Sequence, residues 1–433
     1  MSGVGEKRIG WGVARAALIA ALLASAPVAA QERPYAPSEA PSSGASVCPG
    51  GLCQSEALVP LFEALRATEK AEREAPVHIL QIGDSHTAAD RITGKLRADF
   101  QGRFGNGGRG VLPAGVPYAG YAPYQVQVRA QGWTSEIAPL AASQDEGYGV
   151  FGMAGMRGRV GPDDALELRF DPGSEPVWFG VCGWPRGAGD GLAVLGDGEP
   201  WTIDLNSPRA NGEPVCTSLP AFRGPITALR LEGVGSGVVL GSIWSAGGRG
   251  VIVSNLGVTG STLSDLAARD DVMLDLEFGV FAPDLVILAY GTNEGFDSSL
   301  DAVAYERLLR EQVTRIRAMS GRSILILGAP DALRSGASNG CSVDGQRAPP
   351  PSLAVVRDVQ RRVAADLGVA FWDWHGRMGG DCSADRLALG AEPLMRGDRV
   401  HFTSAGADWI GGILAGDLLA AYDAWKAEQG SAD

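Results

Sequence analysis

The sequence predicts an α/β protein in which helices cover both faces of a parallel sheet. Five apolar runs are continuous rather than alternating, which is typical of parallel strands buried on both faces. They span residues 77–82, 251–255, 285–290, 324–327 and 369–372. Helical patterns occur at residues 56–73, 88–103, 262–276, 302–319, 352–367 and 404–426. Because strand and helix alternate, we expect a three-layer arrangement with one sheet at its centre.

A long insertion interrupts this pattern. About 165 residues separate the first two predicted strands, far more than an ordinary crossover needs. Short alternating runs there, such as those at 124–128 and 166–170, are separated by Gly, Pro, Asp and Asn. These features predict an antiparallel β-sandwich. We therefore divide the chain into an α/β domain at 56–115 and 247–433 and an inserted β-sandwich domain at 116–246.

The amino terminus has the pattern of a secretory signal peptide. Lys7 and Arg8 precede an apolar stretch at residues 16–24, and small residues occupy 28–30. We predict that residues 1–30 are removed. The alternative is an amino-terminal membrane anchor, although the apolar stretch is short for a bilayer. Residues 31–55 are rich in Pro, Ser, Gly and Ala, as in a flexible leader.

Charge and cysteine content limit the partners and the compartment. A formal net charge of −13 gives no general attraction for nucleic acid or anionic lipid. We expect no nucleic-acid partner and no stable membrane insertion after cleavage. Six cysteines follow the predicted cleavage site, which favours disulfides in an exported protein, although free thiols remain an alternative. Nearest-neighbour pairing is our preferred connectivity: 48–53, 182–216 and 341–382.

A serine and a histidine at opposite ends of the chain form the main candidate site. Ser85 lies in Gly-Asp-Ser-His at 83–86, directly after the first predicted strand. His401 and Asp398 lie three residues apart before the last helix. A serine becomes a good nucleophile when a histidine takes its proton and an acid holds that histidine. The alternatives are an ordinary helix-capping turn at Ser85 and a structural histidine at 401.

Acyl transfer also needs donors for the developing oxyanion. Gly257 follows the second strand and offers a backbone N–H, and Asn293 follows the third strand and offers a side-chain amide. Each alone is more often part of a turn. In a doubly wound sheet, however, loops at the carboxyl ends of the strands line one crevice, so these residues are expected to meet Ser85.

These motifs resemble those of the SGNH (GDSL-like) hydrolase superfamily. The resemblance implies a three-layer α/β/α fold with a flavodoxin-like sheet, a triad of Ser85, His401 and Asp398, and an oxyanion hole made by Ser85, Gly257 and Asn293. It implies no metal and no organic cofactor. The cysteine spacings are also unlike those of a zinc site, and the chain has only four histidines.

A narrower resemblance is to bacterial peptidoglycan O-acetylesterases of the Ape type, which carry an inserted domain like a carbohydrate-binding module. Its segments lie at residues 81–86, 104–110, 257–262, 372–374 and 378–380. One departure from the superfamily pattern is Glu294, where an aspartate usually follows the asparagine. This resemblance implies a periplasmic esterase that removes acetyl groups from a cell-wall glycan through an acetyl-serine intermediate. An O-acetyltransferase with the same triad and a non-catalytic peptidoglycan-binding protein are the alternatives. The oligomeric state stays open.

Several other residues have two interpretations. Asp373 beside His375 is an alternative acid, and His86 either contacts substrate or packs in the helix. The glycine-rich stretch at 104–110 is either a nest near the site or a plain loop. Five tryptophans of the insertion either stack on sugar or belong to the core, the latter being the commoner role of large aromatic residues. They are Trp133, Trp178, Trp184, Trp201 and Trp244.

Overall fold

The computed structural model describes Cys48 and residues 51–138, 150–185, 189–205, 213–337 and 340–430. The predicted signal peptide and most of the predicted leader therefore lie outside the described residues. Within the described ranges, no helix is both long and apolar enough to cross a membrane.

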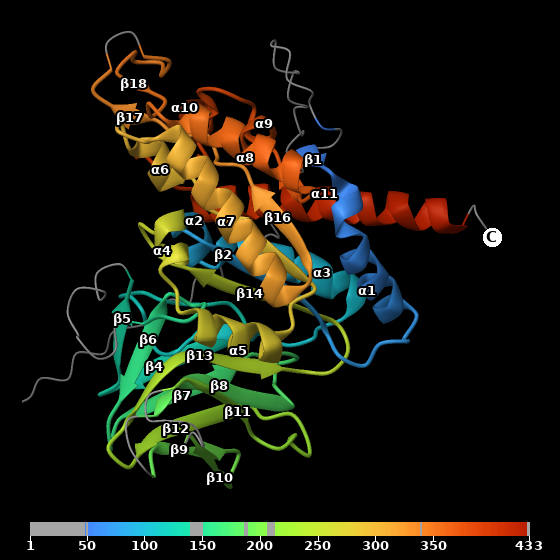
Figure 1. Cartoon of the computed structure of the whole chain (residues 1–433), viewed down its shortest axis with the longest axis vertical. Helices are drawn as coiled ribbons and strands as arrows, with labels where there is room; N and C mark the ends of the chain where they lie inside the picture. The colour runs from blue at the N-terminus through green and yellow to red at the C-terminus, as the bar shows by residue number, and fades with distance from the viewer. Residues whose placement is uncertain are drawn as a thin grey trace, which may run out of the picture. The chain divides into compact units, whose positions relative to one another are not determined.

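A six-stranded sheet forms the centre of the α/β region (Figure 1). Its strands are β1 (Leu52–Cys53), β2 (Val77–Gly83), β14 (Val251–Gly257), β15 (Leu285–Ala289), β16 (Ser323–Leu327) and β19 (Ala370–Trp372). Their order is β1-β19-β16-β15-β2-β14, and all pairs are parallel except β1 with β19. The five parallel strands thus follow the 2-1-3-4-5 order of flavodoxin-like sheets, as predicted. The chain reverses its direction of winding between β2 and β15, and a ligand crevice is expected there.

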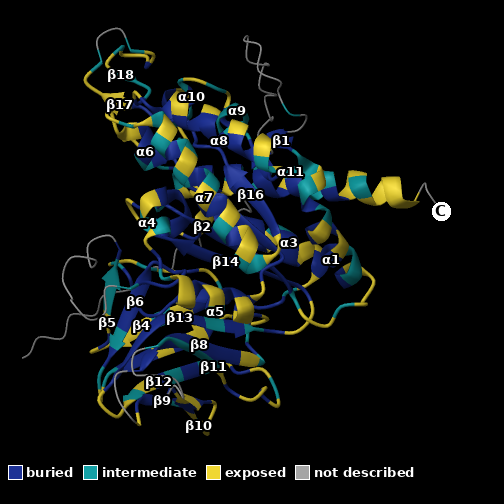
Figure 2. Ribbon diagram, in the orientation of Figure 1, coloured by how far each residue is buried: buried dark blue, intermediate teal, exposed yellow. Residues whose placement is uncertain are grey.

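Helices cover both faces of this sheet, and the strands are buried throughout (Figure 2). Val77 and Ile79 of β2 join one core cluster, whereas Leu80 and Ile82 join another. The first cluster contains α1 (Val59–Glu69), α3 (Arg91–Phe104) and α11 (Ser404–Gly430). The second contains α4 (Leu263–Ala267), α5 (Asp271–Phe281), α7 (Ala302–Ser320) and α8 (Leu353–Leu367). Because successive residues of a strand point to opposite faces, these continuous apolar runs supply both cores.

Two antiparallel sheets form the inserted region. One has the order β10-β9-β12-β7-β4, and the other β11-β8-β13-β6-β5, with β3 also paired to β13. The bounds are β3 (Gly110–Pro113), β4 (Val126–Gln131), β5 (Thr134–Ile137), β6 (Met156–Val160), β7 (Ala165–Phe170), β8 (Trp178–Pro185), β9 (Gly191–Gly196), β10 (Glu199–Asp204), β11 (Val215–Ser218), β12 (Ala228–Val234) and β13 (Val238–Ala246). A separate apolar cluster draws side chains from both sheets. The predicted fold class is confirmed, while the exact domain boundaries remain a prediction.

The two regions share buried polar contacts. Glu277 of α5 is completely buried and accepts hydrogen bonds from Ser242 Oγ in β13 and from Met153 N, both at 2.5 Å. Burial raises the pKa of Glu277 to about 7. A buried carboxylate needs such donors, so these hydrogen bonds fix the position of α5 against the inserted region.

The cysteines pair as predicted, in three disulfides: Cys48–Cys53, Cys182–Cys216 and Cys341–Cys382. The second joins neighbouring strands β8 and β11 of the inserted region. The third joins two segments at the carboxyl ends of the parallel strands, after β16 and after β19. Crosslinks of this kind persist in oxidising compartments.

Candidate active site

The nucleophile turn begins where β2 ends. Asp84 caps the short helix α2 (Ser85–Ala88), because its carboxylate accepts the His86 N–H at 2.9 Å. Gly83 leaves no room for a side chain, since a Cβ there would lie 2.5 Å from the Ala289 carbonyl oxygen of β15. The tight turn places Ser85 at the carboxyl edge of the sheet, beside the point where the winding reverses.

The structure brings together the serine, histidine and aspartate predicted from the sequence. Ser85 Oγ lies 3.0 Å from His401 Nε2, and His401 Nδ1 lies 2.8 Å from Asp398 Oδ2. A carboxylate can only accept, so Nδ1 carries the proton and Nε2 is free to accept the serine proton. The three residues are therefore arranged for nucleophilic catalysis.

The turn that carries His401 is held from several sides. Asp398 Oδ1 accepts the N–H groups of Val400 and His401 at 2.9 and 3.0 Å. Burial alone would raise the pKa of Asp398. The hydrogen bonds and the imidazole have the larger effect, so the pKa lies below its ordinary value. Arg399 takes a left-handed conformation, with φ of 59°, and its side chain bonds to buried Asp385 at 2.9 Å. The acid is thus ionised and fixed beside the histidine at neutral pH.

Asn293 lies at the start of α6 (Thr292–Phe296), directly after β15. Its side-chain nitrogen donates to Ser261 O at 2.8 Å, which leaves the second amide hydrogen for a ligand. The neighbouring Glu294 is buried and accepts the Leu263 N–H at 2.8 Å, and burial raises its pKa to about 7. Both side chains therefore fix the segment that follows β14.

Gly257, predicted as an oxyanion donor, is the last residue of β14. The Val258 N–H donates to Gly83 O on β2, so the preceding N–H, that of Gly257, points to the opposite edge of β14. Thr259, by contrast, lines the cavity beside Ser85, and Gly260 is exposed with φ of 78°. Gly257 and Gly260 are therefore both candidates for the backbone donor, Gly260 because it follows Thr259 at the cavity. The sequence motif alone does not distinguish Gly257 from Gly260. They differ in backbone conformation, since only Gly260 has a left-handed φ.

A cavity of about 350 Å³ opens beside Ser85 and His401. Arg91 and Ile92 of α3 line one side, and Arg396 and Phe402 line another. Further lining residues are His86, Ala88, Ala89, Tyr118, Thr259, Thr403, Ser404 and Ala407. Tyr118 comes from the segment between β3 and β4, and its hydroxyl donates to Ala88 O at 2.6 Å. Tyr118 could not be predicted as a site residue, because the predicted fold did not place the insertion against the nucleophile helix.

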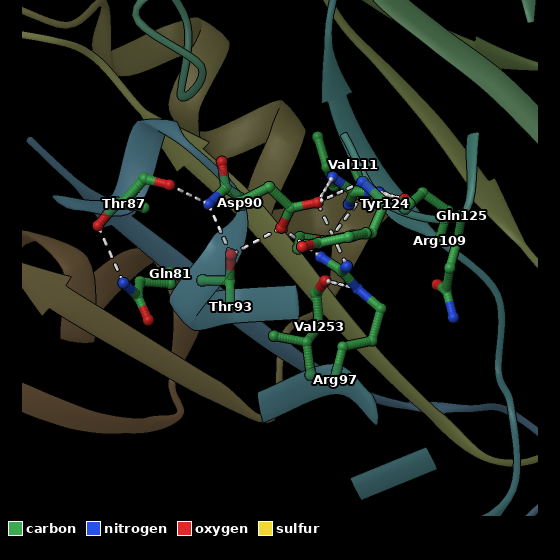
Figure 3. Close-up of polar contacts among 12 residues, drawn as sticks. Gln81, Thr87, Asp90, Thr93, Arg97, Arg109, Val111, Tyr124, Gln125 and Val253 are labelled. Carbon is green, nitrogen blue, oxygen red and sulfur yellow. Dashed lines mark hydrogen bonds and ion pairs between the residues drawn. The ribbon is translucent and has the colours of Figure 1, made fainter. Parts of the chain in front are cut away.

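A buried ionic cluster centres on Asp90, which precedes α3 and follows the nucleophile helix (Figure 3). Asp90 bonds Arg97 Nη2 at 2.8 Å and Arg109 Nη2 at 3.1 Å, and all three side chains are buried. The same carboxylate accepts Thr93 Oγ1 at 2.7 Å and Tyr124 N at 3.0 Å. Burial raises the pKa of Asp90, but the two arginines lower it below its ordinary value. Burial lowers the pKa of Arg109 to about 10, so it remains a cation at neutral pH.

The other candidates from the sequence lie elsewhere. Asp373 caps α9 (Trp374–Met378) by accepting Gly376 N, and His375 bonds Asp381 at 2.9 Å. The 104–110 segment forms backbone hydrogen bonds with Val251, at the amino end of β14. Ser85 lies at the carboxyl ends of the strands, so the segment is at the other end of the sheet from it. Trp133 and Trp184 are buried in the core, whereas Trp178 is 38% exposed. Trp201 and Trp244 are half-buried.

Comparison with known proteins agrees with this architecture. The sequence pattern of the GDSL-like lipase/acylhydrolase family matches residues 226–409. A solved peptidoglycan O-acetylesterase superposes with a TM-score of 0.72 at 26% identity, covering 86% of this chain and 99% of that one. Over residues 226–409 the sequence matches this GDSL-like (SGNH) family, and the fold of the chain is similar to that of the solved esterase. The family match and the similar solved structure support an esterase-type enzyme. The family match contains His401 but begins inside the insertion, just before β12, so it does not include Ser85.

Other solved structures are less similar to this chain. An acetyl xylan esterase matches at 16% identity with a TM-score of 0.27, covering 38% of this chain and 78% of that one. A family two carbohydrate esterase from Cellvibrio japonicus matches at 12% identity with a TM-score of 0.27, covering 72% and 98%. These scores carry no argument about function. The comparison with curated protein sequences found no match.

Proposed function

We propose that this protein removes O-acetyl groups from a cell-wall glycan, peptidoglycan in the first instance. The observation that carries the proposal is the Ser85–His401–Asp398 chain of hydrogen bonds, at 3.0 and 2.8 Å, beside an open cavity. The extensive similarity to a peptidoglycan O-acetylesterase supports the choice of substrate. The disulfides support an extracytoplasmic location, and we propose the periplasm.

Catalysis would proceed in two acyl-transfer steps. Ser85 Oγ attacks the acetyl carbonyl while His401 Nε2 takes its proton, and Asp398 stabilises the imidazolium. The oxyanion is held by the Ser85 N–H, the Asn293 amide and a backbone N–H of the 257–260 segment, that of Gly257 or of Gly260. The imidazolium then protonates the departing sugar oxygen, which leaves acetyl-Ser85. Water attacks this ester, His401 accepts the water proton, and acetate and free Ser85 are formed.

Acetate release from natively acetylated and from base-treated peptidoglycan tests the proposal. The wild-type protein should release acetate only from the native material. Ser85→Ala should lower the rate by several orders of magnitude with an unchanged circular dichroism spectrum. Ser264→Ala, in an exposed serine of α4, is the matched control and should behave as wild type.

Three results bear directly on the alternatives. A near-wild-type rate for Ser85→Ala would refute the nucleophile. Acetyl transfer to glycan hydroxyls in preference to water would favour the transferase. Peptidoglycan binding without cleavage of p-nitrophenyl acetate would favour the non-catalytic alternative.

A further inference from the structure

His86 connects the two turns that carry the predicted catalytic residues. Its ring is buried, and Nε2 lies 2.9 Å from the Val400 carbonyl oxygen in the turn that ends at His401. Nδ1 lies 3.2 Å from Asp84 Oδ1 in its own turn. The rings of His86 and His401 are stacked, with centroids 5.6 Å apart. One imidazole therefore contacts both Asp84, the residue before Ser85, and Val400, the residue before His401.

The hydrogen-bond partners of the two ring nitrogens indicate the protonation state of His86. A carbonyl oxygen can only accept, so Nε2 must carry a hydrogen. The Asp84 carboxylate also accepts, and it already receives the His86 backbone N–H, so Nδ1 carries a hydrogen as well. An imidazole with two N–H groups is a cation. The alternative partner of Nδ1 is the Thr292 hydroxyl, whose oxygen lies at the longer distance of 3.4 Å.

The surroundings favour this cation. The charged or titratable neighbours are Asp84 on its own turn, and Asp398 and His401 on the facing turn. Thr292 of α6 is uncharged, and the remaining contacts are the aromatic rings of Trp374 and Phe402. Burial lowers the pKa of His86, but the Asp84 carboxylate and the two hydrogen bonds raise it more, so that it lies above the ordinary value.

We propose that His86 is a positioning residue whose protonated ring holds the Ser85 turn against the His401 turn. By joining Asp84 to Val400 O, the ring fixes the separation of Ser85 Oγ and His401 Nε2. The inference depends on the proposed function, because it concerns the alignment of that nucleophile and base. A misplacement of about 1 Å between reacting groups can cost about 10²-fold in rate, so this alignment matters for catalysis.

The sign of the pH effect follows from the raised pKa of His86. The interaction with Asp84 is complete below the ordinary histidine value of about 6.5 and is lost as the pH rises through the higher value in the folded protein. Neutral His86 keeps only one N–H, so its bond to either Asp84 or Val400 is lost. We therefore expect kcat to fall at alkaline pH, as His86 loses its proton.

Kinetics with p-nitrophenyl acetate test the role without depending on the glycan. His86→Leu removes both donors and should lower kcat about 10²-fold while KM changes less than about twofold. His86→Gln keeps one donor group that does not titrate, so its kcat should lie between those of the wild type and His86→Leu, and the alkaline decline should be abolished. His375→Gln, in a half-buried histidine outside the cavity, is the control and should keep the wild-type profile.

An NMR titration of the imidazole Cε1–H signals tests the charge directly in the wild-type protein. The chain has four histidines, and the variants assign His86. We expect this signal to show a cation at pH 6 and to titrate above the ordinary value. A neutral His86 at pH 6, or a wild-type kcat and pH profile in His86→Leu, would overturn the proposal. If the leucine variant fails to fold, the titration and His86→Gln decide. If the wild-type protein cleaves no ester, the proposed function fails, and the titration still reports on His86.

Discussion

Replacing Asp90 by Asn should destabilise the protein strongly, because two buried guanidinium groups share this carboxylate. Arg97 and Arg109 are each 1% exposed, and their bonds to Asp90 measure 2.8 and 3.1 Å. Asparagine preserves the shape of the side chain but removes its charge. The two cations then stay buried without an anion, and Thr93 and Tyr124 compete for one remaining acceptor.

The expected loss is about 3–5 kcal/mol of unfolding free energy, the usual cost of removing one partner from a buried ion pair. Urea denaturation measures it as a lower midpoint at an unchanged slope. Asp99→Asn on α3 is the matched control, since Asp99 forms an ion pair with Lys95, four residues earlier, and both side chains are partly exposed. Such a pair contributes about 0.3–0.5 kcal/mol.

The comparison of these two variants decides whether the cluster is structural. A loss in Asp90→Asn no larger than that in Asp99→Asn would refute the reasoning, because the buried arginines would then not need the carboxylate. A loss of the expected size with unchanged kcat at low temperature would assign the cluster to stability alone. A fall in kcat in the folded variant would show that the cluster also positions the nucleophile helix.

Two further predictions concern the site itself. Asp398→Asn should lower kcat on p-nitrophenyl acetate by about 10⁴-fold and leave the fold intact, because the amide no longer fixes the histidine tautomer; a loss of under tenfold would contradict the triad. Gly257→Ala should lower the melting temperature whether or not Gly257 takes part in catalysis, since a Cβ would overlap the Ala88 backbone nitrogen. Gly279→Ala on α5 is its control: no atom lies near its added Cβ, so it should raise the unfolding free energy by up to about 1 kcal/mol.

Much of the fold follows from local patterns. The run at 77–82 became β2, and the helices predicted at 302–319 and 352–367 became α7 and α8 with nearly the same bounds. These elements are long or continuously apolar, so neighbouring segments barely change their preference. The predicted helix at 262–276 is instead two helices, α4 and α5, because Asp270 accepts the Met273 N–H and caps a new start.

Parts of the site could not be predicted from sequence spacing. Ser85 and His401 were predictable because each follows a strand at the same edge of a parallel sheet. The Asp90 cluster was not, since Asp90 has a left-handed φ of 49° and its two arginine partners come from α3 and from the residue before β3. Likewise, the contacts of His86 with Asp84 and Val400 join segments more than 300 residues apart along the chain.

The placement of the insertion explains why these missed residues gather around the nucleophile. The chain enters the inserted region through β3 and leaves it through β13, and these strands pair directly, with Leu112 opposite Ile243. The entry and exit therefore lie side by side, so the first crossover can hold an extra domain without separating β2 from β14. The chain after β3 then passes over the α/β region, where Tyr118 bonds Ala88 O and Tyr124 N bonds Asp90. Through Tyr118 the insertion forms part of the wall of the cavity, and both contacts support the helices on either side of Ala89, next to Ser85.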